Sequence, residues 1–237
     1  MRQEPLTGYV LHARPYQEKR AIYQYFSQEF GMVHGVGGRG VPAFVLVSLF
    51  ASGQTALKSF SQITIVNQNT VCHRGQGQYA LLYMNEVLCK LLAPENPCPE
   101  LWHSYQDAVA ALLALGVVGV ADAQKNRQLR LILRHFEREL FAELGVGIYF
   151  VNNKGDELAD DVCYEFVADT GFVPSDKVMS YNGTALKAMA QAEHHPALYE
   201  QYAKEFGQIQ RTMMDYLLDY KPLHSRTLWQ QNLKYQS

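Results

Sequence analysis

Three glycines near the N-terminus have the spacing of a phosphate-binding loop, because Gly35, Gly37 and Gly40 spell G-x-G-x-x-G. In dinucleotide enzymes this loop follows a strand and opens at once into a helix, whose free N–H groups bind the pyrophosphate. Here Pro42 and the β-branched, aromatic run AFVLVSLF follow, which indicates another strand. No Asp or Glu occurs in residues 51–71 to bind a ribose hydroxyl. The sequence therefore predicts a strand and a tight turn, not a nucleotide site.

Groups that could make or break covalent bonds are few. Asp160 and Asp161 form a carboxylate pair in an acidic loop, where such pairs are ordinarily solvated. Ser225 lies near His224 and Asp219, but the three are local neighbours, and no G-x-S-x-G elbow surrounds the serine. The phosphate-binding pattern G-x-x-x-x-G-K-[ST] is absent from the sequence. We therefore expect a protein that is not an enzyme and has no cofactor.

Cations with aromatic residues between them favour a binding role. Residues 1–78 hold seven Lys and Arg against three Asp and Glu, although the net charge of the chain is −2. A single-strand binder needs cations for the phosphates and aromatic faces for base stacking. We predict a nucleic-acid face made of Arg14, Lys19, Arg20, Arg39, Lys58 and Arg74, interleaved with Tyr9, Tyr16, Tyr23, Tyr25 and Phe44. The alternative is solvated charge scattered over core aromatics.

A second candidate site is a stripe of arginines in residues 124–144, where the pattern predicts a long helix. Steps of three, four and four residues put Arg127, Arg130, Arg134 and Arg138 on one helical face, and we expect Leu131 and Phe141 to flank it. Leu129, Ile132, Leu133, Phe136 and Leu140 make the opposite, core-facing stripe. Arginines beside apolar residues suit an acidic, hydrophobic peptide with a terminal carboxylate. The alternative is a solvated helix face.

The elements that position these residues are of two kinds, which makes the fold class α+β. Five strands are expected in the first 75 residues, at 8–14, 20–27, 31–38, 42–50 and 56–66. Such a set suggests a five-stranded, partly open barrel of the OB type, a frequent binder of oligonucleotides. Helical periodicity follows from residue 79, broken by an irregular acidic insertion at 151–175. We place an OB-type domain at 1–77 and an all-α domain at 78–237.

Composition limits the remaining classes. The four cysteines contain no C-x-x-C pair, so we expect free thiols and no zinc site. No long uncharged apolar stretch indicates a membrane span, and the N-terminus lacks the apolar segment of a signal peptide. We expect a cytoplasmic protein that does not bind membranes.

Several stretches between about residue 8 and residue 229 carry a family resemblance. They are GYVLHARPYQEKRAIYQYFSQEFGMV, YALLYMNEVLCKLL with Tyr83, Asn85 and Glu86, LRHFERELFAELGVGIYF, TGFVPS, NGTALKAMA and KPLHSRTLW. In this order they resemble the opening strands, the first helix, the central helix, a later segment and the closing motif of the RecO family of bacterial recombination mediators. The resemblance implies a nucleoid-associated protein.

The resemblance implies an OB barrel with a helical domain and a role in DNA repair. It implies binding and annealing of single-stranded DNA, docking on the C-terminal tail of the single-stranded DNA-binding protein, and help with RecR in loading RecA. It carries the tail-binding role best onto Arg134. Two departures from the family's pattern weaken the expectation that the barrel binds DNA strongly. The family's basic loop after the third strand is shortened to GGRGVP, and the cysteines of its common zinc site reduce to Cys163. The alternative is therefore a protein-only adaptor between the single-stranded DNA-binding protein and RecR.

Overall fold

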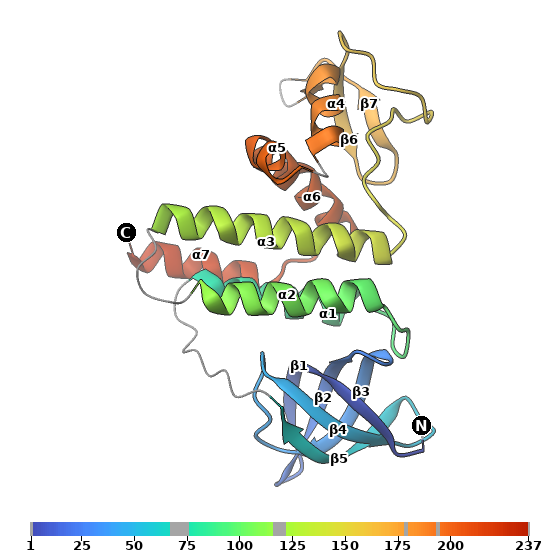
Figure 1. Cartoon of the computed structure of the whole chain (residues 1–237), viewed down its shortest axis with the longest axis vertical. Coiled ribbons are helices and arrows are strands. Elements are labelled where there is room, and N and C mark those ends of the chain that lie inside the picture. The colour runs from blue at the N-terminus through green and yellow to red at the C-terminus, as the bar shows by residue number, and fades with distance from the viewer. Residues whose placement is uncertain (1, 67–75, 116–121, 178–179, 193–194, 237) are drawn as a thin grey trace. The chain divides into compact units, whose positions relative to one another are not determined.

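The computed structural model describes residues 2–66, 76–115, 122–177, 180–192 and 195–236 (Figure 1). It consists of two compact units. The first is Met1–Phe136 together with Pro222–Ser237, and the second is Glu137–Lys221. One residue of the predicted nucleic-acid face, Arg74, lies outside the described residues.

The N-terminal strands form a five-stranded barrel, as the sequence predicts, and this barrel is closed, whereas the sequence suggests a partly open one (Figure 1). They are β1 (Glu4–Tyr16), β2 (Arg20–Ser27), β3 (Gly31–Gly38), β4 (Leu46–Ser52) and β5 (Leu57–Ile65). Their order around the barrel is β1-β2-β3-β5-β4, with β4 paired back to β1. All neighbours are antiparallel except β3 and β5, which run parallel. The core inside is apolar and includes Tyr25 and Phe60. This closed, mixed five-stranded barrel is of the OB type.

The glycines of the G-x-G-x-x-G pattern have a packing reason. Gly35 and Gly37 face the barrel interior, where a Cβ at Gly35 would come within 2.3 Å of the Phe60 ring. A Cβ at Gly37 would come within 2.8 Å of Ile63. Gly40, just beyond β3, has a φ of +92°, which L side chains rarely adopt. The pattern therefore marks a crowded barrel wall and a turn, as expected.

Four helices belong wholly or partly to the first unit: α1 (Gln76–Leu91), α2 (Pro99–Ala114), α3 (Asp122–Glu143) and α7 (His224–Gln236). Pro99 begins α2, a position where a missing N–H costs no hydrogen bond. The change from strands to helices lies between Ile65 and Gln76, and the domain boundary expected at 77–78 stays a prediction.

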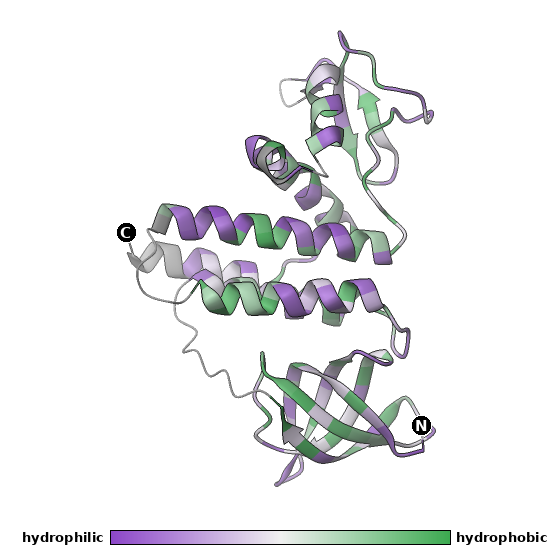
Figure 2. Ribbon diagram, viewed as in Figure 1, coloured by the Kyte–Doolittle hydropathy of each residue, from purple (hydrophilic) through white to green (hydrophobic). Residues whose placement is uncertain are grey.

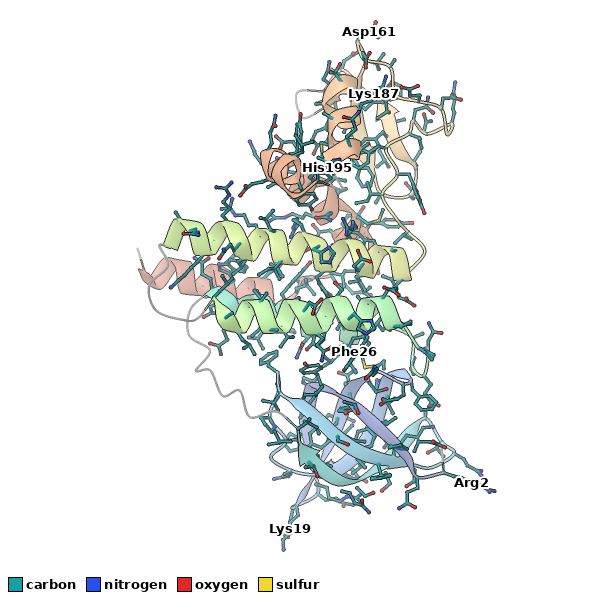
Figure 3. All side chains as sticks on the ribbon, viewed as in Figure 1. Arg2, Lys19, Phe26, Asp161, Lys187 and His195 are labelled. Carbon is teal, nitrogen blue, oxygen red and sulfur yellow. The ribbon has the colours of Figure 1, made fainter. Side chains whose placement is uncertain are left out.

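Aromatic rings join the barrel to α2. Tyr9 and Phe26, which project from the barrel strands, each pack against Trp102 and Tyr105, with ring centroids 5.3–5.6 Å apart. Figure 3 labels Phe26 at this end of the barrel. Beside them, the Tyr105 hydroxyl donates to Asn85 Oδ1 at 2.7 Å, and the Asn85 amide donates to a β1 carbonyl at 2.9 Å. Buried polar groups in a satisfied chain of this kind fix one docking geometry.

The second unit is a small sheet with helices. Its elements are β6 (Cys163–Val167), β7 (Gly171–Pro174), β8 (Tyr181–Asn182), α4 (Gly183–Ala192), α5 (Pro196–Gln201) and α6 (Ala203–Leu217). The sheet has the order β7-β6-β8. The sequence predicts an irregular segment at 151–175, and the structure adds two short strands there. In β6 the buried residues Tyr164 and Phe166 are two positions apart, as in a strand with one buried face. Five residues are too short a stretch for this period to predict a strand from the sequence.

Polar contacts organise the loops of this unit. Asn152 Oδ1 accepts the backbone N–H groups of Lys154 and Asp156 at 2.8 and 2.9 Å, an arrangement that substitutes for a backbone turn. Lys187 on α4 contacts carboxylate oxygens of Glu157 and Asp160, each at 3.0 Å. These contacts tie the acidic loop to α4.

Candidate functional site

The end of the β1–β2 hairpin is the most exposed part of the barrel wall. Every side chain from residue 12 to residue 20 is exposed, yet the strands stay paired up to the partners Tyr16 and Arg20. Three residues, 17–19, close the hairpin, and Gln17 has a φ of +54°. Figure 3 shows Lys19 at the tip, away from the barrel. The hairpin therefore presents its side chains to solvent on a paired backbone.

Arg14, Tyr16 and Arg20 share one face of this hairpin. Residues two apart on a strand project to the same side, which places Arg14 with Tyr16. Tyr16 lies directly opposite Arg20, so their Cβ atoms are about 5 Å apart. The opposite face carries Ala21 and Tyr23, which are buried in the barrel core. The outward face thus combines an exposed aromatic ring with two guanidinium groups.

Arg39 braces the hairpin. Its Nε donates to the Arg20 carbonyl at 2.9 Å, and its Nη2 donates to the Gln17 carbonyl. Its backbone N–H also donates to the Lys19 carbonyl at 3.2 Å. The single cation of the shortened loop after β3 therefore holds the hairpin tip in place, and its hydrogen-bonding groups are partly occupied.

Lys58 does not join the other predicted cations. Its side chain is 4% exposed, and its Nζ lies 2.7 Å from Glu95 Oε1 and donates to the Thr55 carbonyl at 2.7 Å. Alternation along β5 gives the reason, because Lys58 shares the buried side of the strand with Phe60. The expectation of a phosphate contact at Lys58 is corrected to a structural ion pair.

Most aromatic residues placed in the predicted face are also buried. Tyr9, Tyr23 and Tyr25 are 6% exposed or less. The hydroxyls of Tyr23 and Tyr25 donate to barrel carbonyls, and burial raises the pKa of Tyr25 well above its ordinary value. Tyr16, at 42% exposed, is the aromatic residue of this set that offers its ring to solvent, while Phe44 is half-buried. The sequence cannot separate these roles, since tyrosine serves both core and surface.

The arginine stripe of α3 shows a graded exposure. Arg127 and Arg130 are exposed, and Arg134, Arg138 and Leu131 are half-buried. Arg138 forms an ion pair with Glu139, with Nη2 2.9 Å from Oε1. The predicted core stripe is confirmed at Leu129, Leu133, Phe136 and Leu140, which are 5% exposed or less. Figure 2 shows α3 as largely hydrophilic with interspersed hydrophobic positions.

Phe141 needs correction as a member of the exposed tail-binding set. It is 1% exposed and belongs to a core. Residue 141 follows Leu140 around the helix by 100°, and the buried sector of α3 is wide enough at this end to include both. Leu131 remains the apolar residue of the set that reaches solvent, in part.

The sequence does not predict the contact between α1 and α7. The Glu86 carboxylate accepts the backbone N–H groups of His224 and Ser225 at 3.0 and 2.9 Å, and the Ser225 hydroxyl at 2.8 Å. Burial tends to raise the pKa of Glu86, but these hydrogen bonds and Lys90 outweigh it and lower that pKa. The helix α7 begins at His224, so both backbone donors belong to its first turn.

Two more contacts hold α7 on α1. The Arg226 guanidinium lies 5.7 Å from the centre of the Tyr83 ring, and Tyr79 stacks on Trp229 with centroids 6.4 Å apart. The stretches YALLYMNEV and KPLHSRTLW, far apart in sequence, thus lie on two helices that pack against each other.

Among the residues that the structure describes, no three His, Cys, Asp or Glu side chains cluster closely enough to hold a metal ion. Burial raises the pKa of the Cys89 thiol to about 12, so this group stays protonated at neutral pH. Within the same described ranges, none of the helices combines the length and apolar character needed to cross a bilayer.

Comparison with known proteins gives a consistent result. No family model matches the chain. It is 32% identical over 250 residues to the DNA repair protein RecO of Pseudoalteromonas atlantica, which covers 98% of this chain and 96% of that protein. It is 31% identical to RecO of Pasteurella multocida, over 97% and 95% of the two chains, and 29% identical to RecO of Vibrio cholerae, over 94% and 92%. With a five-stranded OB-type barrel, a helical remainder and near full-length similarity, this chain belongs to the RecO family of DNA repair proteins.

Proposed function

We propose that this protein is a recombination mediator that binds and anneals single-stranded DNA through the barrel. It would dock on the C-terminal tail of the single-stranded DNA-binding protein through α3 and, with RecR, assist the loading of RecA. The observation that carries the DNA-binding part is the braced hairpin, where Arg14 and Arg20 share an exposed, paired face with Tyr16 and Lys19 is exposed at the tip. Cations for phosphates together with an aromatic face are the combination that a single-strand binder needs.

The tail-binding part rests on α3. Arg127, Arg130 and Arg134 lie on one side of the helix with Leu131 partly exposed among them. Guanidinium groups grip carboxylates in a forked geometry, and an acidic, hydrophobic tail offers both side-chain and terminal carboxylates. One module then holds the DNA strand while the other holds the single-stranded DNA-binding protein. Because both modules belong to one chain, binding at one raises the effective concentration at the other, so two weak contacts suffice.

An oligo-dT titration followed by fluorescence anisotropy tests the DNA part. Three cations in contact with a single strand give a slope of log affinity against log salt of about −2, so affinity falls about 20-fold from 50 to 200 mM salt. The variant Arg14→Ala reduces the slope by about 0.7. Arg2→Ala is the matched control, since Arg2 is an exposed cation beyond the other end of β1. Equal effects of the two variants would contradict the assignment.

A second titration tests the tail site with a labelled acidic, hydrophobic peptide that ends in a free carboxylate. Arg134→Glu should abolish measurable binding, and Arg2→Glu should leave it unchanged. An unchanged affinity of Arg134→Glu would refute the assignment of the tail to α3.

In the alternative, the protein is an adaptor that binds the tail of the single-stranded DNA-binding protein and RecR but has little affinity for DNA. One structural observation favours it, namely that Arg39, the remaining cation of the loop after β3, is hydrogen-bonded to the hairpin backbone. In that case wild-type protein binds the tail peptide but not oligo-dT at low salt.

A further inference from the structure

We infer that Tyr16 is a base-stacking platform for single-stranded nucleic acid, with Arg14 and Arg20 holding the phosphates on either side of the stacked nucleotide. This deepens the proposed DNA-binding function and rests on it. The chemistry recognised is any unpaired base, because every base has a π-face, so the site is expected to tolerate all sequences.

Exposure alone does not select Tyr16. Tyr149 and Tyr220 are more exposed, at 72% and 73%. Tyr220, however, lies between Asp219 and Lys221, which form an ion pair at 3.1 Å, so the charges on either side of it offset each other. Tyr16 differs because the residue opposite it and the residue two before it on the same face are both arginines.

The ring of Tyr16 and the two guanidinium groups are also available. Within the described part of the chain, no ring–ring or cation–π contact involves Tyr16, and no carboxylate pairs with Arg14 or Arg20. Arg20 makes one long hydrogen bond, from Nη2 to the Val36 carbonyl at 3.5 Å. Glu18 at the tip is the nearby acidic side chain in the sequence, and it occupies the turn, outside the paired face. Tyr16 therefore has exposed ring surface, at 42% exposed, that no neighbouring ring or cation of the described residues occupies.

The hairpin is arranged before any ligand arrives. Strand pairing extends to Tyr16 and Arg20, and Arg39 connects the loop after β3 to the carbonyls of Gln17 and Arg20. A side chain held on ordered backbone loses less conformational entropy on binding than one on a mobile loop. We therefore expect stacking at Tyr16 to contribute to the binding free energy as much as a typical base–aromatic contact does.

The test compares Tyr16→Ala and Tyr16→Phe with wild type in oligo-dT titrations at several salt concentrations. Tyr16→Ala should weaken binding roughly 5- to 100-fold with an unchanged salt slope, because it removes a stacking surface but no charge. Tyr16→Phe keeps the ring and should stay within about 2-fold of wild type. Thermal unfolding of each variant shows whether the barrel is intact.

A direct readout uses an oligonucleotide with a single 2-aminopurine, whose fluorescence is quenched on stacking. Wild type and Tyr16→Phe should quench it, and Tyr16→Ala should not. An oligomer of abasic sites gives the matched ligand control, and wild type and Tyr16→Ala should bind it equally.

The outcomes separate this inference from the proposed function. If wild type binds oligo-dT and Tyr16→Ala binds it equally well with equal quenching, the stacking site is wrong and DNA binding stands. If Tyr16→Ala loses affinity for the abasic oligomer to the same degree, its role is structural and the inference also fails. If wild type does not bind oligo-dT at all, the DNA-binding function itself fails.

Discussion

Replacing Lys58 should separate a structural cation from the DNA-binding ones. The ammonium group is buried, and two oxygens, one on Glu95 and one on the Thr55 backbone, lie 2.7 Å from it. Breaking a fully buried ion pair costs about 3–5 kcal/mol. The Glu95 side chain is 38% exposed, so water can solvate it again, and we expect Lys58→Met to lower the free energy of unfolding by about 1–2 kcal/mol.

Two measurements on the same protein check this. A loss of about 1–2 kcal/mol should lower Tm by about 2–8 °C in a chain of this size. In oligo-dT titrations Lys58→Met should keep the wild-type salt slope, whereas Arg14→Ala should reduce that slope by about 0.7 and leave Tm unchanged. Lys58→Met thus changes only Tm, and Arg14→Ala changes only the salt slope.

A double variant, Lys58→Met with Glu95→Gln, is the control for the ion pair itself. Removing both charges should cost less than the sum of the two single changes, because neither partner is left charged and unpaired. The reasoning is refuted if Lys58→Met keeps its Tm but reduces the salt slope by about 0.7, since Lys58 would then contact phosphate.

Two further perturbations test the rest of the fold. Glu86→Gln weakens the acceptor of three hydrogen bonds from His224 and Ser225, and should lower the unfolding free energy by about 1–2 kcal/mol, measured by chemical denaturation. Because the folded-state pKa of Glu86 is lowered, its contribution is complete above pH 4.5 and is lost as pH falls through that lowered pKa; wild type should show this acid-side loss, and Glu86→Gln should not. Gly183→Ala places a Cβ 1.9 Å from the Ala159 carbonyl oxygen and should destabilise the second unit by about 2 kcal/mol or more, whereas an equal Tm would contradict the packing there.

The strands could be predicted because each has its own local signal. Buried and half-buried residues alternate in β2 and β4, and Gly40 and Gly53 lie in the breaks before β4 and β5. The strand β1 is longer than expected, reaching Tyr16, because pairing with β2 supports residues that carry no hydrophobic pattern of their own. The chain after α4 is divided into two helices, α5 and α6, with Tyr202 between them. Neither outcome has a strong local signal, since both depend on neighbours distant in sequence.

The candidate site was predictable by residue type and only partly by position. Arg14, Lys19 and Arg20 lie together at the hairpin, because a tight turn places sequence neighbours side by side. Lys58 was misassigned, because the buried side of β5 becomes evident only once Glu95 and the barrel core surround it. Arg39 has the expected exposure, but its hydrogen bonds to the hairpin depend on the pairing of β2 with β3.

The amino-acid sequence by itself determined the OB-type barrel, the helices and the RecO family, because periodicity, turn residues and motif order are local properties of the chain. The tertiary structure alone decided which charged and aromatic side chains reach solvent. Burial depends on the closure of β4 onto β1 and on the packing of α2 against Tyr9 and Phe26. Those contacts join residues far apart in sequence, and no local pattern specifies them.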